Sequence, residues 1–234
     1  MSSNKRPLVI AHRGASADFP ENSLDAFSGA FEQGADWIEL DVRRTKDGVL
    51  VVHHDAHLSD GRLIKDLDSH LLPEEVPSLA EAFEASESMG VNVEIKHLPG
   101  EPDFEERDLV CEAVVGLVKA YRTDDKILVS SFDMNAINRI KETDHSIPTG
   151  WLVAERNDVN QILDRTEAHN HKSINPWDGL VDETLVRQAQ SRGLTVNVWT
   201  VDDERRILQL CDWGVDGIIT NFPGRAVKII NQES

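Results

Sequence analysis

The sequence predicts a TIM-type (β/α)8 barrel, in which eight parallel strands alternate with helices around a closed ring. Short apolar runs alternate with segments of helical periodicity along the whole chain. Ionisable residues stand at or near the ends of four of these runs, where such a barrel places its active site. The length of 234 residues suits a fold that takes about 250. An open, doubly wound sheet is the alternative, but no glycine-rich dinucleotide fingerprint or Walker loop supports it.

The first two strands are predicted to flank one helix and to lead into a hairpin. An apolar run from Leu8 ends in His12, the segment Asn22–Gly34 has helical spacing, and Trp37–Val42 is the second strand. The turn residues Lys46-Asp47-Gly48 then divide Arg43–Val52 into two short β-type runs, which are too close together for a parallel crossover. We therefore expect a hairpin that returns beside the second strand.

The rest of the chain continues the alternation after an irregular stretch. We expect one barrel domain over residues 1–234, with a short insertion at about 55–77. Ser78 and Glu81 form a capping-box pattern at the start of a helix that extends to Gly90. Six further strand–helix pairs follow: Val91–Lys96 with Glu105–Tyr121, Ile127–Ser131 with Asp133–Thr143, Thr149–Val153 with Val159–Ala168, Ser173–Asn175 with Asp182–Arg192, Thr195–Val201 with Asp203–Trp213, and Asp216–Asn221 with Gly224–Asn231.

The composition of the chain argues against several classes of binding partner. The net charge of −18 argues against binding to nucleic acid or to an anionic membrane, because both are polyanions. The apolar runs are far shorter than the ~20 residues of a membrane span, and the polar N-terminus does not have a signal-peptide pattern. Cys111 and Cys211 lie far apart and are expected as buried thiols rather than metal ligands. These features together favour a cytoplasmic protein with a small-molecule substrate.

Three carboxylates are candidates for a metal site. Glu39 and Asp41 are two residues apart on a strand, so both side chains lie on the same face. On a buried face the two charges repel, which a divalent cation would relieve. Glu94 has a matching position on the next barrel strand and offers a third oxygen ligand. An all-carboxylate set without cysteine suits Mg²⁺ or Ca²⁺ better than Zn²⁺.

Two cations near these carboxylates are candidates for phosphate contacts. Arg13 offers a planar fork that can bind two phosphate oxygens, and Lys96 offers a point charge. Gly14 lets the backbone approach a ligand closely. The alternative is an ion-pair network in which the carboxylates are neutralised by Arg13, Arg43 and Lys96 without any ligand.

His12 and one histidine of the hairpin are candidates for acid–base catalysis. A histidine titrates near neutral pH, and two of them across a phosphate could take a proton and give one to the leaving group. The hairpin should bring His53 and His54 opposite Glu39 and its neighbours, but strand alternation alone does not choose between the two. The remaining histidines lack such a setting and are expected at the surface: His57, His70, His97, His145, His169 and His171.

Several of these residues stand in motifs of a known family. The motifs, in order, are His12-Arg13-Gly14-Ala15-Ser16, Pro20-Glu21-Asn22-Ser23, Glu39-Leu40-Asp41-Val42, Thr45-Lys46-Asp47-Gly48, His54-Asp55, Glu94-Ile95-Lys96, Ser131-Phe132, Val198-Trp199-Thr200-Val201 and Gly217-Ile218-Ile219-Thr220. The chain resembles the glycerophosphodiester phosphodiesterase family over nearly its whole length, because the complete ordered set is far more specific than any one tripeptide.

The resemblance implies a TIM barrel that hydrolyses glycerophosphodiesters to glycerol 3-phosphate and an alcohol, with a divalent metal. It implies Glu39, Asp41 and Glu94 as metal ligands, His12 and His54 as the acid–base pair, and Arg13 and Lys96 as phosphate contacts. His54 is favoured over His53 because the family motif is His followed by Asp. Glu21 would support the site from behind the ligands. Trp199 would pack on the substrate at the barrel mouth, with a core aromatic as the alternative role.

The chain also departs from the family pattern. Ser59-Asp60-Gly61 stands where the family usually has arginine and threonines, the stretch from Asp60 to Pro77 is short, and Asn221 replaces a common aspartate. These differences leave the substrate preference open. A lysophospholipase D acting on lysolipids and a non-catalytic barrel that binds a phosphodiester are the alternatives. Water and the substrate's own hydroxyl both remain as candidate nucleophiles.

Overall fold

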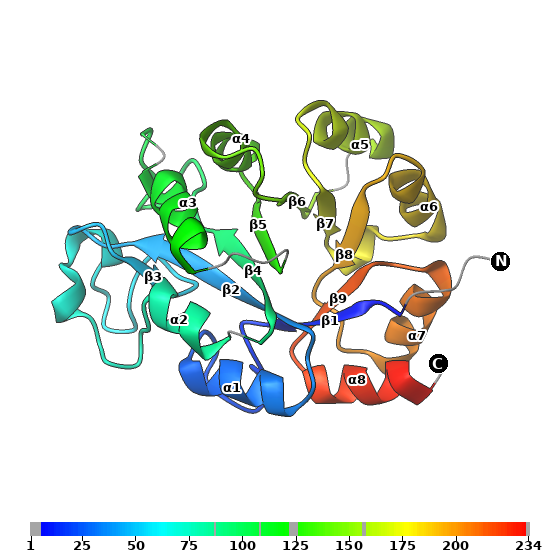
Figure 1. Cartoon of the computed structure of the whole chain (residues 1–234), viewed down its shortest axis with the longest axis horizontal. Coiled ribbons are helices and arrows are strands. Elements are labelled where there is room, and N and C mark those ends of the chain that lie inside the picture. The colour runs from blue at the N-terminus through cyan, green and yellow to red at the C-terminus, as the bar shows by residue number, and fades with distance from the viewer. Residues whose placement is uncertain (1–5, 87, 108, 122–125, 156–157, 233–234) are drawn as a thin grey trace.

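A closed barrel forms the centre of the molecule (Figure 1). The structure is a computed structural model that describes residues 6–86, 88–107, 109–121, 126–155 and 158–232. Eight parallel strands follow one another around the ring, and β1 pairs with both β2 and β9, which closes it. The helices lie outside the ring (Figure 1). The predicted TIM barrel is therefore confirmed, and the open sheet is excluded by the β1–β9 pairing.

The order of elements agrees with the prediction, while several ends differ by a few residues. The strands are β1 (Leu8–His12), β2 (Trp37–Arg44), β3 (Leu50–Val52), β4 (Gly90–Ile95), β5 (Ile127–Ser131), β6 (Thr149–Val153), β7 (Ser173–Pro176), β8 (Thr195–Val198) and β9 (Gly217–Thr220). The helices are α1 (Leu24–Glu32), α2 (Leu79–Ala85), α3 (Leu109–Tyr121), α4 (Met134–Thr143), α5 (Val159–Ala168), α6 (Glu183–Ser191), α7 (Glu204–Trp213) and α8 (Pro223–Gln232). The expected helix start at Glu105 is too early, since α3 begins at Leu109; residue 108 lies outside the described residues.

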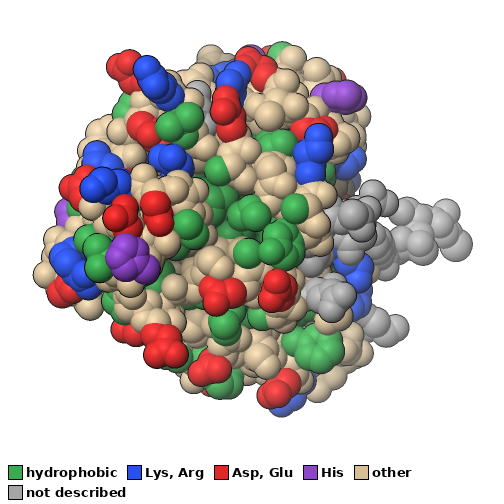
Figure 2. All heavy atoms as spheres, turned by 60° about the vertical axis from the view of Figure 1, so that its left-hand side comes forward, with side chains coloured by type: hydrophobic (Ala, Val, Ile, Leu, Met, Phe, Trp, Pro, Cys, Tyr) green, Lys and Arg blue, Asp and Glu red, His purple; other side chains and the backbone are tan. Residues whose placement is uncertain are grey.

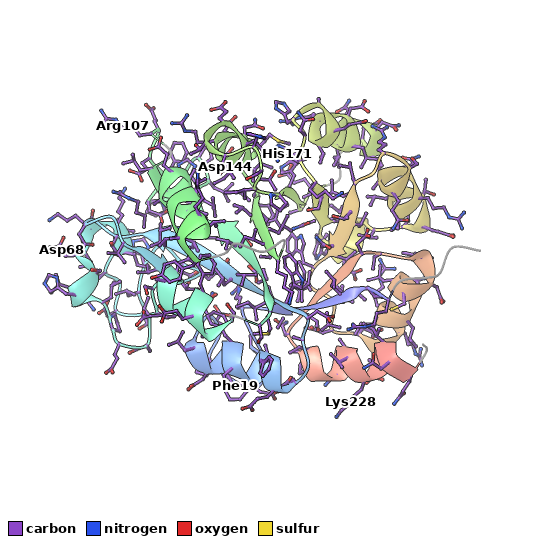
Figure 3. The ribbon with its side chains drawn as sticks, in the orientation of Figure 1. Phe19, Asp68, Arg107, Asp144, His171 and Lys228 are labelled. Atoms are coloured by element: carbon purple, nitrogen blue, oxygen red, sulfur yellow. The ribbon has the colours of Figure 1, made fainter. Side chains whose placement is uncertain are left out.

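The predicted hairpin is present and carries the two neighbouring histidines back to β2. β3 pairs antiparallel with β2, with Val52 opposite Val42. The backbone N–H of His53 donates to the carbonyl of Asp41 at 3.0 Å, so the histidines return near Asp41, two residues beyond the expected Glu39. The insertion that follows contains two short 3₁₀ turns and packs on its own small apolar cluster around Ile64. It projects from the barrel on the β3 side, where Asp68 is labelled in Figure 3.

The apolar core lies mainly between the strands and the surrounding helices. Alternate residues of each strand, such as Leu40 on β2 and Val196 on β8, point outward and pack against buried helix residues such as Phe27 of α1 and Leu210 of α7. The other face of each strand points into the barrel. This division leaves the inward-facing positions free to carry polar side chains, and the site uses them.

Two of the histidine predictions are wrong. His97 and His171 were expected at the surface, yet both are buried. His171 lies against α4, where it contacts the Asn138 side chain at 3.1 Å and also bonds to Thr149 Oγ1 at 2.8 Å (Figure 3). A sequence gives no local signal for such burial, because the partners come from other elements.

The prediction of buried cysteines is confirmed for Cys111 but not for Cys211, and the surface is rich in acidic side chains. Cys111 is buried and Cys211 is partly buried. Acidic side chains are scattered across the face shown in Figure 2, with Lys and Arg side chains among them. Among the described helices, none has both the length and the apolar character needed to cross a membrane.

Gly14 is predicted to be essential for the loop after β1. Its φ is +80°, and a Cβ there would lie 2.6 Å from the carbonyl carbon of Ala26 in α1. Gly14→Ala should therefore lower the free energy of unfolding by about 3 kcal/mol, measured by urea denaturation. Gly193 is the matched control, since its φ is +76° but a Cβ would meet nothing within 4 Å. An equal loss in Gly14→Ala and Gly193→Ala would show that the contact with α1 does not matter.

Candidate active site

The proposed ligands gather at the C-terminal end of the barrel because neighbouring strands bring them into register. His12 of β1 is the Cα partner of Glu39 on β2, and Asp41 is the partner of Glu94 on β4. Partners on adjacent parallel strands point to the same side of the sheet, about 4.8 Å apart. All four side chains therefore face the same region inside the barrel.

The three carboxylates form one buried cluster. One oxygen each of Glu39, Asp41 and Glu94 lies within 4.8 Å of the other two. Burial, with the charges of the neighbouring carboxylates, raises the pKa of Glu39 well above its usual value. Burial and the charge of Asp41 raise the pKa of Glu94 to about 7. Glu39 Oε1 is buried and has no hydrogen-bond partner among the described residues. An unpaired buried oxygen among hard oxygen donors fits a divalent cation of the Mg²⁺ or Ca²⁺ type.

Arg13 and Lys96 neutralise part of this charge. Lys96 Nζ lies 2.9 Å from Glu94 Oε1 and 3.6 Å from Asp41 Oδ1, and Arg13 Nε lies 3.2 Å from Asp41 Oδ2. Burial alone would raise the pKa of Asp41, but these two cations outweigh it and hold the pKa below its usual value. The alternative ion-pair network is thus present only in part, because Arg43 pairs with Glu101 and Asp103 instead of with these carboxylates. It does not satisfy every acidic atom, since Glu39 Oε1 stays unpaired.

The tautomer of His12 is fixed by a hydrogen-bond chain from β9. His12 Nδ1 lies 2.7 Å from Asn221 Oδ1, and Asn221 Nδ2 donates to Asp202 Oδ2 at 2.7 Å. Because the amide nitrogen is committed to Asp202, the amide oxygen faces His12, and Nδ1 must carry the proton. Nε2, 4.0 Å from Glu39 Oε2, is then the free nitrogen. Burial lowers the pKa of His12, which favours the neutral ring.

His54 is held from both its side chain and its backbone. Its Nδ1 lies 2.7 Å from Asp55 Oδ1, and this hydrogen bond lowers the pKa of Asp55. Its carbonyl accepts two hydrogen bonds from the buried Arg43, from Nε at 2.8 Å and Nη2 at 2.7 Å. The remaining Arg43 nitrogen, Nη1, donates to Glu101 at 2.9 Å and also to Asp103. His53 instead bonds to the Asp55 carbonyl at 2.8 Å.

Glu21 and its neighbour Asn22 support the site from the loop before α1. Glu21 Oε1 accepts from Arg13 Nη1 at 2.8 Å, so Glu21 contacts the predicted phosphate-binding arginine and not one of the three carboxylates. Asn22 was not predicted to act, yet its Nδ2 donates to Asp41 Oδ2 at 2.8 Å and its Oδ1 accepts from the Asp41 N–H at 3.2 Å. Its φ of +59° suits asparagine, the ordinary residue that best tolerates this region. The sequence signal that could have identified Asn22 is its place in the Pro20-Glu21-Asn22 motif.

Aromatic residues line the opposite side of the barrel mouth. Trp199 follows β8, is partly buried, and donates from Nε1 to the Asn175 carbonyl at 2.7 Å. Its ring meets Phe132 edge to face, with centroids 5.5 Å apart, and Lys96 Nζ lies 6.0 Å from the Phe132 ring centroid. Trp177, the bridge partner of Trp199, is 48% exposed. Phe132 and Trp199, referred to below as the aromatic wall, thus lie beside Lys96.

Comparisons with known proteins agree on one family. The model of the glycerophosphoryl diester phosphodiesterase family matches residues 12–225. A glycerophosphodiester phosphodiesterase of Caldanaerobacter subterraneus is 32% identical over 97% of this chain and 99% of its own length. One of Bacillus altitudinis is 31% identical over 94% and 97%. The solved structure of an Oleispira antarctica phosphodiesterase in complex with the product sn-glycerol-3-phosphate is 29% identical, covers 97% of both chains and has a TM-score of 0.87.

The raised pKa of Glu94 predicts how stability depends on pH without a cation. An unfolded glutamate loses its proton near its ordinary value of 4.5, whereas the folded protein keeps this proton up to about 7. The folded state thus binds more protons between these values, so the contribution of Glu94 to the free energy of unfolding falls as pH rises. Glu94→Gln should flatten this fall, measured by urea denaturation in EDTA at pH 5.5 and 7.5. An unchanged slope in the variant would contradict the assignment.

Proposed function

Because the chain belongs to the glycerophosphoryl diester phosphodiesterase family, we propose that it hydrolyses glycerophosphodiesters to glycerol 3-phosphate and an alcohol by histidine acid–base catalysis at a carboxylate-bound cation. Membership of the family makes it a phosphoric diester hydrolase. The observation that carries the finer proposal is the meeting of three buried carboxylates with two histidines and two cations at one end of the barrel. A surface ion-pair network would not need a buried acidic oxygen without a partner.

Glu39, Asp41 and Glu94 are proposed to hold the divalent cation, with Mg²⁺ and Ca²⁺ as the candidates. Bound there, the cation would supply positive charge to the non-bridging phosphate oxygens. Burial and the neighbouring carboxylates raise the pKa of Glu39 and of Glu94, so cation binding would compete with protonation of these carboxyls. Lys96 and Arg13 lie beside these carboxylates, where their N–H donors are proposed to bind the phosphate oxygens.

The two histidines are proposed to have different roles. His12 carries its proton on Nδ1 and is kept neutral by burial, so Nε2 is suited to accept a proton from the nucleophile. His54 binds a carboxylate through Nδ1 and leaves Nε2 to donate to the oxygen of the leaving alcohol. Arg43 fixes the backbone of His54, which limits how far the ring can move. Each ring is thus oriented by a fixed partner, as acid–base catalysis requires.

Trp199 is proposed to contact the substrate beside the phosphate. Its edge-to-face packing on Phe132 and its Nε1 bond to Asn175 hold the ring in place. Lys96, the proposed phosphate contact, lies next to Phe132, so a diester bound at Lys96 would reach the aromatic wall with its carbon atoms. The binding of sn-glycerol-3-phosphate by the Oleispira antarctica relative supports the glycerol 3-phosphate half of the proposed substrate.

The direct test is release of glycerol 3-phosphate from glycerophosphocholine and glycerophosphoethanolamine, with Mg²⁺, with Ca²⁺ and with EDTA. We expect release with at least one cation and its loss in EDTA, because the carboxylate cluster cannot neutralise the phosphate by itself. Equal release in EDTA would contradict the proposed metal dependence. Absence of release with either cation, together with release of lysophosphatidic acid from lysophosphatidylcholine, would replace the substrate class with lysolipids.

The pair His54 and His53 tests the acid–base assignment with matched variants. His54→Ala should lower kcat by about 100-fold or more, because it removes the proposed proton donor. His53→Ala removes the same side chain from the neighbouring position, where the ring bonds only to a backbone carbonyl, and should stay near wild type. A larger loss in His53→Ala than in His54→Ala would reverse the assignment.

A further inference from the structure

The interior of this barrel below the carboxylate cluster is unusually polar. Barrels of this fold are usually filled by layers of bulky branched residues such as valine, isoleucine and leucine. Here buried amide and hydroxyl side chains occupy several inward-facing positions on β4, β5, β7 and β8, namely Asn92, Ser130, Ser173, Asn175 and Asn197. Buried polar groups lower stability unless they are paired, so these positions require an explanation.

Among the described residues of the barrel interior, Asn92 is the side chain whose two amide atoms both lack a hydrogen-bond partner. Asn92 is 1% exposed, and its Nδ2 and Oδ1 are both buried without a partner. Ser130 Oγ on the adjacent β5 is also unpaired, as is Glu39 Oε1 on β2. On the opposite wall, Asn175 Nδ2 is also unpaired, but Asn175 Oδ1 accepts from Ser173 and from Asn197. Asn92 therefore differs from Asn175, because its amide contributes no hydrogen bond to the fold.

The register places the Asn92 amide beside the Glu39 carboxylate. Asn92 is the Cα partner of Glu39, and it lies two residues before Glu94 on the same face of β4. The side chains of Asn92 and Glu39 thus leave adjacent strands, about 4.8 Å apart, toward the same space. Asn92 offers amide N–H donors, and Glu39 offers an unpaired oxygen acceptor.

We propose that Asn92 is a positioning residue for Glu39: its amide donates to the Glu39 carboxylate, directly or through one bound water, when the carboxylate is ionised around a cation. The proposal rests on Glu39 as a ligand in the proposed function. A fixed carboxylate binds a cation more tightly than one that must first be ordered, and partners behind metal ligands commonly have this role. Asn92 is then retained for binding, at the expense of stability in the cation-free protein.

The test compares cation affinity with stability in Asn92→Leu and Asn92→Ala. Removing the unpaired amide should leave Tm in EDTA unchanged or raise it by about 2–4 °C in Asn92→Leu. The same change should weaken Mg²⁺ or Ca²⁺ binding about 10-fold or more, measured by titration calorimetry. The alanine variant excludes overpacking by leucine as the cause, because it adds no atoms. A purely structural residue would not give this result, in which Tm stays the same or rises while cation affinity falls.

Asn175→Ala is the matched control. It removes an asparagine of the same barrel interior whose oxygen is paired, so it should lower Tm while cation affinity stays within about 2-fold of wild type. Unchanged affinity in both Asn92 variants would overturn the proposal. So would a joint loss of Tm and affinity in both, which would make Asn92 structural. A wild-type protein that binds neither cation would overturn the proposed metal site as well, which separates the two failures.

Discussion

The arrangement of the site depends on the repulsion among three carboxylates buried at the end of a barrel. Glu39, Asp41 and Glu94 cannot all be ionised there unless positive charge is brought close to them. Arg13 and Lys96 supply part of it, and the raised pKa values of Glu39 and Glu94 show that this part is insufficient. The remaining demand for positive charge is what a divalent cation would meet. This demand for positive charge also explains why Arg13 and Lys96 lie at the site in a chain whose net charge is −18.

The polar residues around the carboxylate cluster mainly fix the orientation of the two histidines. Asn221 has its nitrogen committed to Asp202 and so sets the proton position on His12. Arg43 holds the His54 carbonyl with two donors while its third nitrogen binds the loop after β4. Asn221 and Arg43 each use more than one hydrogen bond to hold neighbouring groups in place. Both histidines are therefore oriented before any substrate binds. Asparagine in place of the common aspartate at 221 still provides the acceptor that His12 needs.

Sequence patterns could predict the fold and most of the cluster, but not its supports. A period of two put Glu39 and Asp41 on one face, and the strand order brought Glu94 beside them. The sequence could not predict the role of Arg43, because its partners Glu101 and Asp103 follow 58 and 60 residues later in an irregular loop. The burial of His97 and the unpaired amide of Asn92 depend in the same way on neighbouring elements, which local polarity does not report.

The two ends of the barrel differ in the side chains that β1 and β2 direct into the interior. A cavity of about 930 Å³ opens at the opposite, N-terminal end, yet it contains none of the proposed catalytic residues. Its wall includes Leu8, Ile10 and Trp37, which are the inward positions of β1 and β2 below His12 and Glu39. The inward faces of β1 and β2 therefore change from apolar to ionisable toward the C-terminal end of the barrel. Because the carboxyl ends of parallel strands meet at one rim, this change of character brings His12, Glu39 and Asp41 together at that end.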